Sequence, residues 1–105
     1  MPTKLRSSGS SLTSQHVNEV AFPLAIALLV LEALAGTGVA VLGGDFWRRT
    51  ETGDFRPTYE NWYIERASDE PGEQFAERSV ERARQEIGRS QRTGNYVTLT
   101  CRALR

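Results

Sequence analysis

The feature that most constrains the fold is an apolar stretch, residues 39–49, that contains Gly43-Gly44 and ends in charged residues. Valine, phenylalanine and tryptophan favour extended structure, and the stretch is short for a helix. Its first four residues are apolar, which predicts cover on both faces, whereas Asp45 and two arginines must reach water. Glycine weakens a strand, so the pair predicts a bulge or a close approach by another backbone or a ligand. We therefore predict that this stretch is the central strand.

Length and composition limit the chain to one domain and to few kinds of chemistry. The 105 residues suffice for one domain, and 13 basic residues balance 13 acidic ones, so no overall field attracts nucleic acid or an anionic membrane. The single cysteine, Cys101, excludes an internal disulfide and fits a reducing compartment such as the cytoplasm. With His16 as the one histidine, zinc sites and catalytic triads are not expected, and we predict no cofactor.

The N-terminal third divides into a polar part and an apolar part. Residues 1–18 are rich in serine and poor in apolar side chains, which predicts a flexible tail followed by a single domain over residues 19–105. A helix is expected over residues 23–35, because Pro23 fits a first helical turn and Gly36 or Gly38 fits its end. Its predicted core stripe is Leu24, Ala27, Leu28, Leu31, Leu34 and Ala35, and its other side is Ile26, Leu29, Val30 and Ala33.

Because both sides of this helix are apolar, burial, lipid and an interface all stay open, and a homodimer through the helix is one possibility. Lys4 and Arg6 before an apolar segment imitate a secretory signal, but Glu32 interrupts that segment. The uninterrupted apolar run, residues 20–31, is shorter than the roughly 20 residues that span a bilayer. We favour a cytoplasmic protein and keep a secreted or membrane-anchored one as an alternative.

The segment after the central strand is expected to complete a β-hairpin, because a polar loop with Gly53 separates two extended runs. Pro57 cannot donate a ladder hydrogen bond, which predicts that the second strand, residues 55–65, lies at an edge of the sheet or begins after Pro57. Alternation places Glu60, Trp62 and Ile64 on one side and Tyr59, Asn61 and Tyr63 on the other, with Trp62 and Ile64 as the core candidates.

The C-terminal part predicts a helix and a third strand. Over residues 73–89, a stripe of Ala76, Val80, Ala83 and Ile87 with Phe75 beside it indicates an amphipathic helix. Residues 95–104 alternate strictly, which indicates a strand. Its predicted inward residues are Val97, Leu99, Cys101 and Ala103, and its outward residues are Tyr96, Thr98, Thr100 and Arg102.

The order of these elements, α-β-β-α-β, predicts a two-layer α+β fold. The hairpin makes the first two strands antiparallel, and the second helix returns the chain so that the third strand can pair with the first. The expected sheet is three-stranded and mainly antiparallel, with the order 2-1-3, and two helices cover one face. Parallel pairing of the second and third strands is the competing topology.

The hairpin also carries the residue types that dominate protein interfaces. Alternation keeps several of its aromatic and arginine side chains off the core, although these aromatics could also simply cap the sheet. Segment 45–70 holds seven acids against four arginines, and this excess of negative charge could speed association with a cationic surface. The predicted partner-binding residues are Asp45, Trp47, Arg48, Tyr59, Glu60, Asn61 and Tyr63, and the predicted structural motif is Gly43, Gly44 and Trp62.

A different kind of site is also possible at the same place. Two acids and an amide can hold a hard cation, so Asp45, Glu60 and Asn61 could form a metal or catalytic site. The spacing of these residues is unspecific, and polar residues at strand ends are ordinary. We keep a small metal-binding or catalytic domain as the alternative function, which tight cation binding would reveal.

Three parts of the sequence together carry a family resemblance: Leu-Gly-Gly-Asp-Phe at residues 42–46, Tyr-Glu-Asn-Trp-Tyr at residues 59–63, and the helix with Phe75, Arg78, Ser79 and Ala83. Over about residues 22–104 the chain resembles the immunity protein 40 family of bacterial polymorphic toxin systems. The resemblance implies a small cytoplasmic protein that binds and blocks a cognate toxin domain and has no catalysis of its own. It predicts a stoichiometric complex with a toxin encoded next to it, broken by charge reversal at Asp45 or Glu60.

Overall fold

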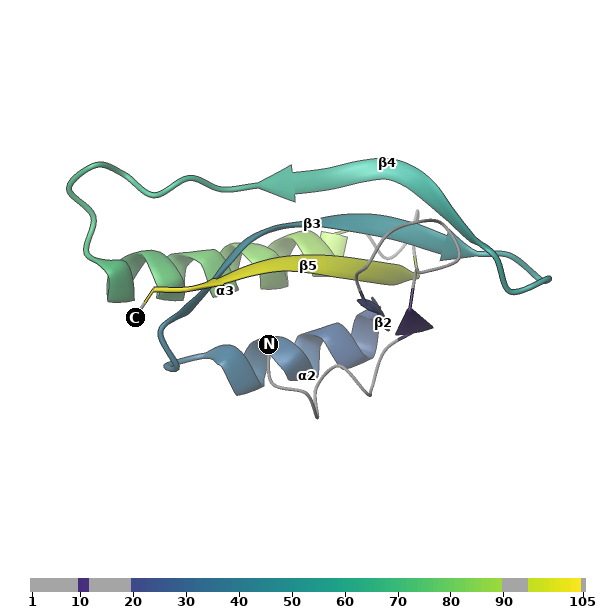
Figure 1. Cartoon of the computed structure of the whole chain (residues 1–105), viewed down its shortest axis with the longest axis horizontal. Helices are drawn as coiled ribbons and strands as arrows, with labels where there is room; N and C mark the ends of the chain where they lie inside the picture. The colour runs from purple at the N-terminus through teal and green to yellow at the C-terminus, as the bar shows by residue number, and fades with distance from the viewer. Residues whose placement is uncertain (1–9, 12–19, 90–94, 105) are drawn as a thin grey trace.

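The computed structural model describes residues 10–11, 20–89 and 95–104, and they form one α+β domain. All strand pairs are antiparallel, in a single sheet with the order β1-β2-β5-β3-β4. The two helices lie on the same face of this sheet, and the β3–β4 hairpin extends beyond them (Figure 1). The elements are β1 (Ser10–Ser11), β2 (Val20–Pro23), α2 (Leu24–Leu34), β3 (Val39–Arg49), β4 (Phe55–Tyr63), α3 (Gly72–Arg89) and β5 (Tyr96–Ala103).

The predicted α+β class, the two helices on one face and the order β4-β3-β5 are confirmed, but the three-stranded sheet is wrong. The sequence analysis assigned no element to residues 20–22 and began the helix at Pro23, whereas residues 20–23 form β2 beside β5, with Phe22 opposite Val97. The apolar run is continuous through Pro23, which ends the strand and precedes the first helical residue, so composition does not mark the boundary. The competing parallel topology is also wrong, because β5 pairs with β3.

Most of the predicted N-terminal tail, including His16, lies outside the described residues. Within residues 1–18 the structure describes Ser10–Ser11, which form β1 and pair with Ala21 and Val20 of β2. The division of the chain into a tail and a domain from residue 19 stays a prediction.

Helix α2 is turned differently from its prediction. Gly36 and Gly38, with φ angles of 78° and 82°, follow its end as predicted, in a conformation that residues with a Cβ rarely adopt. Val30, assigned to the outer side, is buried, because α2 contacts α3 as well as the sheet. Ala35 lies beyond the helix and is exposed, so it does not belong to the core stripe. The buried residues of α2 are Ala27, Val30, Leu31 and Leu34.

The exposed apolar surface on the outer side of α2 is therefore smaller than the sequence suggested. Leu29 is exposed, as is Ala33, whereas Ile26 is half-buried. Among the described helices, none has the combination of length and apolar character that a membrane crossing requires.

The paired glycines of β3 allow β4 to approach closely. The register with β5 shifts between Val41 and Gly43, and a Cβ on Gly43 would collide with the backbone of β4 at Trp62. A Cβ on Gly44 would lie 2.5 Å from the Trp62 ring and 2.8 Å from the carbonyl oxygen of Thr98. The predicted bulge and close approach are both present. They let the Trp62 ring reach Phe46, with 5.5 Å between ring centroids, in the main core.

Helix α3 and strand β5 follow their predicted patterns with two exceptions. The stripe of α3 is buried as predicted. In β5, Thr98 was assigned outward but is buried, and its hydroxyl accepts a hydrogen bond from the indole of Trp47. Ala103 was assigned inward but is exposed. It is the last residue of the strand, and the alternating pattern continues there beyond the part of the sheet that the helices cover. Cys101 is half-buried next to the core, and burial raises the pKa of its thiol to about 11, which disfavours a reactive thiolate.

Candidate protein-interaction surface

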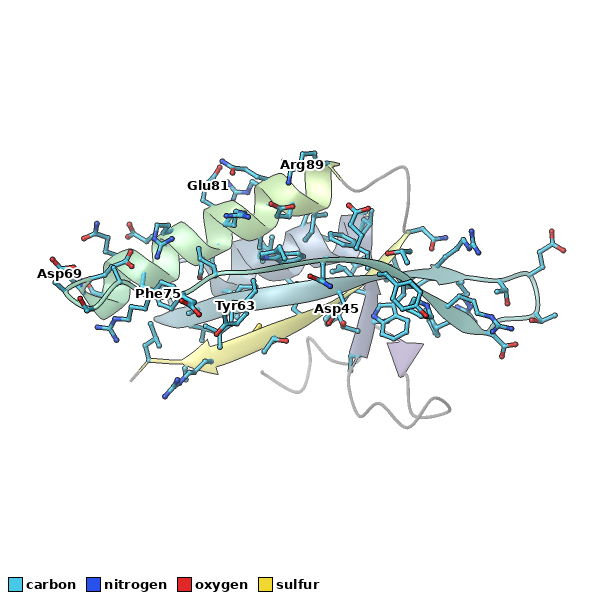
Figure 2. The ribbon with its side chains drawn as sticks, turned by 90° about the horizontal axis from the view of Figure 1, so that it is seen from above. Asp45, Tyr63, Asp69, Phe75, Glu81 and Arg89 are labelled. Carbon is cyan, nitrogen blue, oxygen red and sulfur yellow. The ribbon has the colours of Figure 1, made fainter. Side chains whose placement is uncertain are left out.

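The strands β3 and β4 turn opposite residues to opposite sides of the sheet. Gly44 pairs with Trp62 on the helix side, so the neighbouring pairs lie on the other side. Asp45 opposite Asn61, together with Tyr63, forms what we call the outer face. All three side chains are exposed, Tyr63 by 66%, and Figure 2 shows Asp45 and Tyr63 on the side of the sheet away from α3. Three of the seven predicted binding residues thus lie together.

Tyr59 lies beside the outer face at an irregularity of β4. The β3–β4 register shifts between Asp45 and Trp47. There the hydroxyl of Thr58 donates to the carbonyl oxygen of Phe46 at 2.9 Å and accepts from the Glu60 amide at 3.1 Å, so a side chain replaces ladder hydrogen bonds. Tyr59 has a φ of 64° and its side chain is 86% exposed. For a bulky residue this backbone conformation costs about 1–3 kcal/mol, so the protein maintains an exposed tyrosine at a cost in stability.

The other predicted binding residues have different surroundings. Trp47 is half-buried against a small cluster of Ala21, Phe55 and Tyr96, so capping the sheet is its visible role. Arg48 is exposed on the face opposite to Trp47, directly across from Arg56.

Glu60, also predicted to bind a partner, is half-buried beside the bulge. It lies on the strand between Tyr59 and Asn61, whose side chains are both exposed. The structure therefore brings Asp45, Asn61 and Tyr63 together, with Tyr59 next to them on β4. Trp47 lies on the same side of β3 as Asp45 but is half-buried, and Arg48 lies on the opposite side.

A buried carboxylate that the sequence analysis missed fixes the end of β4. Both oxygens of Glu70 accept hydrogen bonds from Arg78, each at 2.8 Å, and Arg78 also donates to the carbonyl oxygen of Glu65. The hydrogen bonds from Arg78 and from the Ala67 amide hold the pKa of Glu70 down at about 2. Glu70 precedes the helix, so no helical spacing links it to Arg78 and no sequence signal marks the pair. The ion pair between Glu70 and Arg78, which we call the lock, joins the connection that follows Tyr63 to α3.

A cleft of about 550 Å³ lies at this same end of the sheet. Its apolar lining comes from Leu42, Ile64, Phe75 and Leu104, and Arg66 and Arg102 lie at its edge. Tyr63 lines it as well, and Figure 2 shows Tyr63 and Phe75 at the same end of the molecule. The cleft is therefore continuous with the outer face.

The three residues of the alternative metal site are close together along the strands, and this proximity is the only support for that site among the described residues. Asp45 and Asn61 are opposite one another, and Glu60 is the neighbour of Asn61. Within the described ranges, no group of three or more histidine, cysteine, aspartate or glutamate side chains has an arrangement that could hold a metal ion.

Tyr59 and Tyr63 are exposed on the edge strand β4, near a carboxylate and an amide. Such a surface is typical of protein-binding domains, because tyrosine is enriched where interfaces gain most of their energy. The comparison with protein families gives the more specific class. The model of the family Immunity protein 40 matches residues 11–101, and the chain belongs to this family, as the sequence resemblance predicted. No curated protein and no solved structure matches the chain.

Proposed function

We propose that this protein neutralises a cognate toxin domain of a bacterial polymorphic toxin system by binding it in the cytoplasm, with no catalysis of its own. Membership of the immunity family supports a protein partner. The observation that carries the proposal is the exposure of Tyr59 and Tyr63, by 86% and 66%, on the edge strand β4. Two large aromatic side chains that contribute little to the core are best explained by contact with another protein.

The outer face combines apolar anchors with polar specificity. Tyr59 and Tyr63 would supply contact area at a low cost in conformational entropy, and each has a hydroxyl for a hydrogen bond at the rim. Asn61 lies between them along β4 and pairs with Asp45, so a partner that covers both tyrosines must also satisfy a carboxylate and an amide. The surface therefore selects for a partner with donors or cations at its centre.

Charge supports a cationic surface on the toxin. The segment 45–70 carries seven acids against four arginines, and Glu70 is already paired with Arg78. If the toxin is a nuclease, its phosphate-binding cleft is such a surface, and the attraction would speed association and weaken at high salt.

The test is calorimetric titration of the purified protein into the catalytically inactive toxin domain encoded by the neighbouring gene. We expect a 1:1 complex that Tyr63→Ala weakens by about 30-fold or more, as for a central aromatic anchor, with Asp45→Arg weakening it comparably. Arg84→Ala on the outer surface of α3 is the matched control and should bind as the parent does. Absence of a complex, or full affinity in both outer-face variants, would contradict the proposal.

Self-association through α2 stays a proposal of lower rank. It would rest on Leu29 and Ala33, a smaller apolar area than the sequence suggested. Light scattering of the purified chain distinguishes a monomer from a dimer.

A further inference from the structure

We infer that the cleft at the end of the sheet binds a segment of the toxin that places an apolar side chain next to a carboxylate. This inference rests on the proposed function and deepens it, because it adds a second, chemically distinct contact to the outer face. The occupant is a peptide segment of the partner protein.

The shape of the cleft fits a side chain. Its volume of about 550 Å³ lies in the range of sites that hold small organic groups. Ile64 and Phe75 form a nearly buried floor, at 6% and 3% exposure, and Leu42 and Leu104 are half-buried walls. The Leu104 amide donates to the carbonyl oxygen of Gly38, which fixes that wall. An aliphatic or aromatic group that enters would bury apolar surface on a preformed floor.

The two arginines at the edge of the cleft favour a negatively charged group on the occupant. Arg66 and Arg102 line the cleft against one acid, Glu65, and neither arginine forms an ion pair with a residue that the structure describes. The Nε atom of Arg66 donates to the carbonyl oxygen of Glu70 at 2.7 Å, which orients its guanidinium group while other donors stay available. Guanidinium groups bind carboxylates through paired hydrogen bonds, so a carboxylate beside the apolar group is the complementary chemistry.

The position of the cleft suits a partner that already covers the outer face. Tyr63 belongs to both surfaces. Arg102 of β5 lies opposite Ala40 of β3. Two residues before Arg102, Thr100 pairs with Gly43, which is two residues from Asp45 on β3. One protein can therefore contact Asp45 on the outer face with a cation and place a carboxylate near Arg66 and Arg102 at the cleft, and the two contacts together fix its orientation.

A small probe tests the chemistry of the cleft without the toxin. We would titrate ¹⁵N-labelled protein with 4-phenylbutyrate and, as the uncharged match, with 4-phenylbutyramide. We expect millimolar binding of the carboxylate, with shifts of the amides at residues 63–66 and 102–104, at least threefold tighter than the amide. Arg102→Gln should remove that difference. Shifts elsewhere only, or equal affinity for the two probes, would overturn the inference.

Variants of Arg102 and Arg84 distinguish binding at the cleft from the proposed function as a whole. In the titration with the toxin domain, Arg102→Glu should weaken binding by about tenfold or more, and Arg84→Glu on α3 should not, with circular dichroism showing that both variants are folded. If the parent protein binds and Arg102→Glu binds equally well, the cleft is not a toxin contact, although the immunity function stands. If the parent protein does not bind the toxin, the proposed function itself fails.

Discussion

Trp62 and Tyr63 are neighbours on β4, yet one is 5% exposed and the other 66%. The indole of Trp62 lies over Gly44 against Phe46, in contact with a core that both helices cover. Tyr63 points to the other side, away from the two helices that the structure describes (Figure 2). The comparison shows that one edge strand serves two purposes: its inner residues hold the hairpin on the domain, and its outer residues are available for a partner.

The two sides also differ in which local rule they violate. On the inner side the buried hydroxyl of Ser79 accepts from the Val41 amide at 2.9 Å and donates to the carbonyl oxygen of Ala76, whereas the indole nitrogen of Trp62 has no hydrogen-bond partner among the described residues. On the outer side Tyr59 has a strained backbone and an exposed ring. The strain at Tyr59 supports an exposed side chain and not the core, so the outer side is where we expect substitutions to affect binding more than folding.

The largest expected effect is on the inner side, at Gly44. A Cβ there would lie within 2.8 Å of both the Trp62 ring and the carbonyl oxygen of Thr98, so Gly44→Ala should lower the free energy of unfolding by about 3 kcal/mol. A Cβ on Gly88 in α3 would meet open space, and Gly88→Ala should stabilise by about 0.5–1 kcal/mol. Urea denaturation measures both. Equal stability of the two variants would disprove the close approach.

The next effect separates binding from folding at Tyr59. Asparagine tolerates a positive φ better than tyrosine, so Tyr59→Asn should raise the free energy of unfolding by about 1 kcal/mol. The same change should weaken toxin binding by about tenfold, because the exposed ring is lost. Thermal unfolding and calorimetry measure the two quantities. A variant that is both less stable and fully active would show that Tyr59 has a structural role.

The lock between Glu70 and Arg78 should appear as a pH dependence. The folded-state pKa of Glu70, about 2, lies below the ordinary value of 4.5, so the pair stabilises the fold above pH 4.5 and this stabilisation is lost as the pH falls toward 2. Glu70→Gln should be less stable at pH 7 and should lose less stability over that interval. Denaturation curves from pH 7 to pH 2 give the comparison. Parallel curves for the two proteins would exclude the lock.

The smallest effect is expected for Trp62→Phe. The indole nitrogen is buried and has no hydrogen-bond partner among the described residues, so removing it relieves a cost of about 1–3 kcal/mol while some apolar contact is lost. The two terms oppose each other, and the free energy of unfolding should change by no more than about 1 kcal/mol. A loss above about 3 kcal/mol would mean that the indole nitrogen has a partner.

The parts of the fold that the sequence predicted are those with a clear period. The stripe of α3 and the alternation around Trp62 each have one apolar face, and both were located correctly. Strand β2 was missed because its apolar residues run into those of α2, and Val30 was misplaced because a helix that is apolar on all sides does not show which side faces the core.

The candidate surface was predictable only in its residue types. Alternation predicted the exposure of both Tyr59 and Tyr63, whereas the positive φ of Tyr59 and the hydrogen bonds of the Thr58 hydroxyl beside it had no signal in the sequence. The cleft joins residues 42, 64, 75 and 104, which only the tertiary fold brings together.

The central claim is that the partner covers the outer face of β3 and β4. The most direct measurement is the amide spectrum of the ¹⁵N-labelled protein, free and bound to the inactive toxin domain. The account predicts that signals of residues 43–45 and 59–63 change most, while those of the exposed surface of α3 stay in place. Changes confined to α2 and α3, with an unaltered outer face, would contradict it.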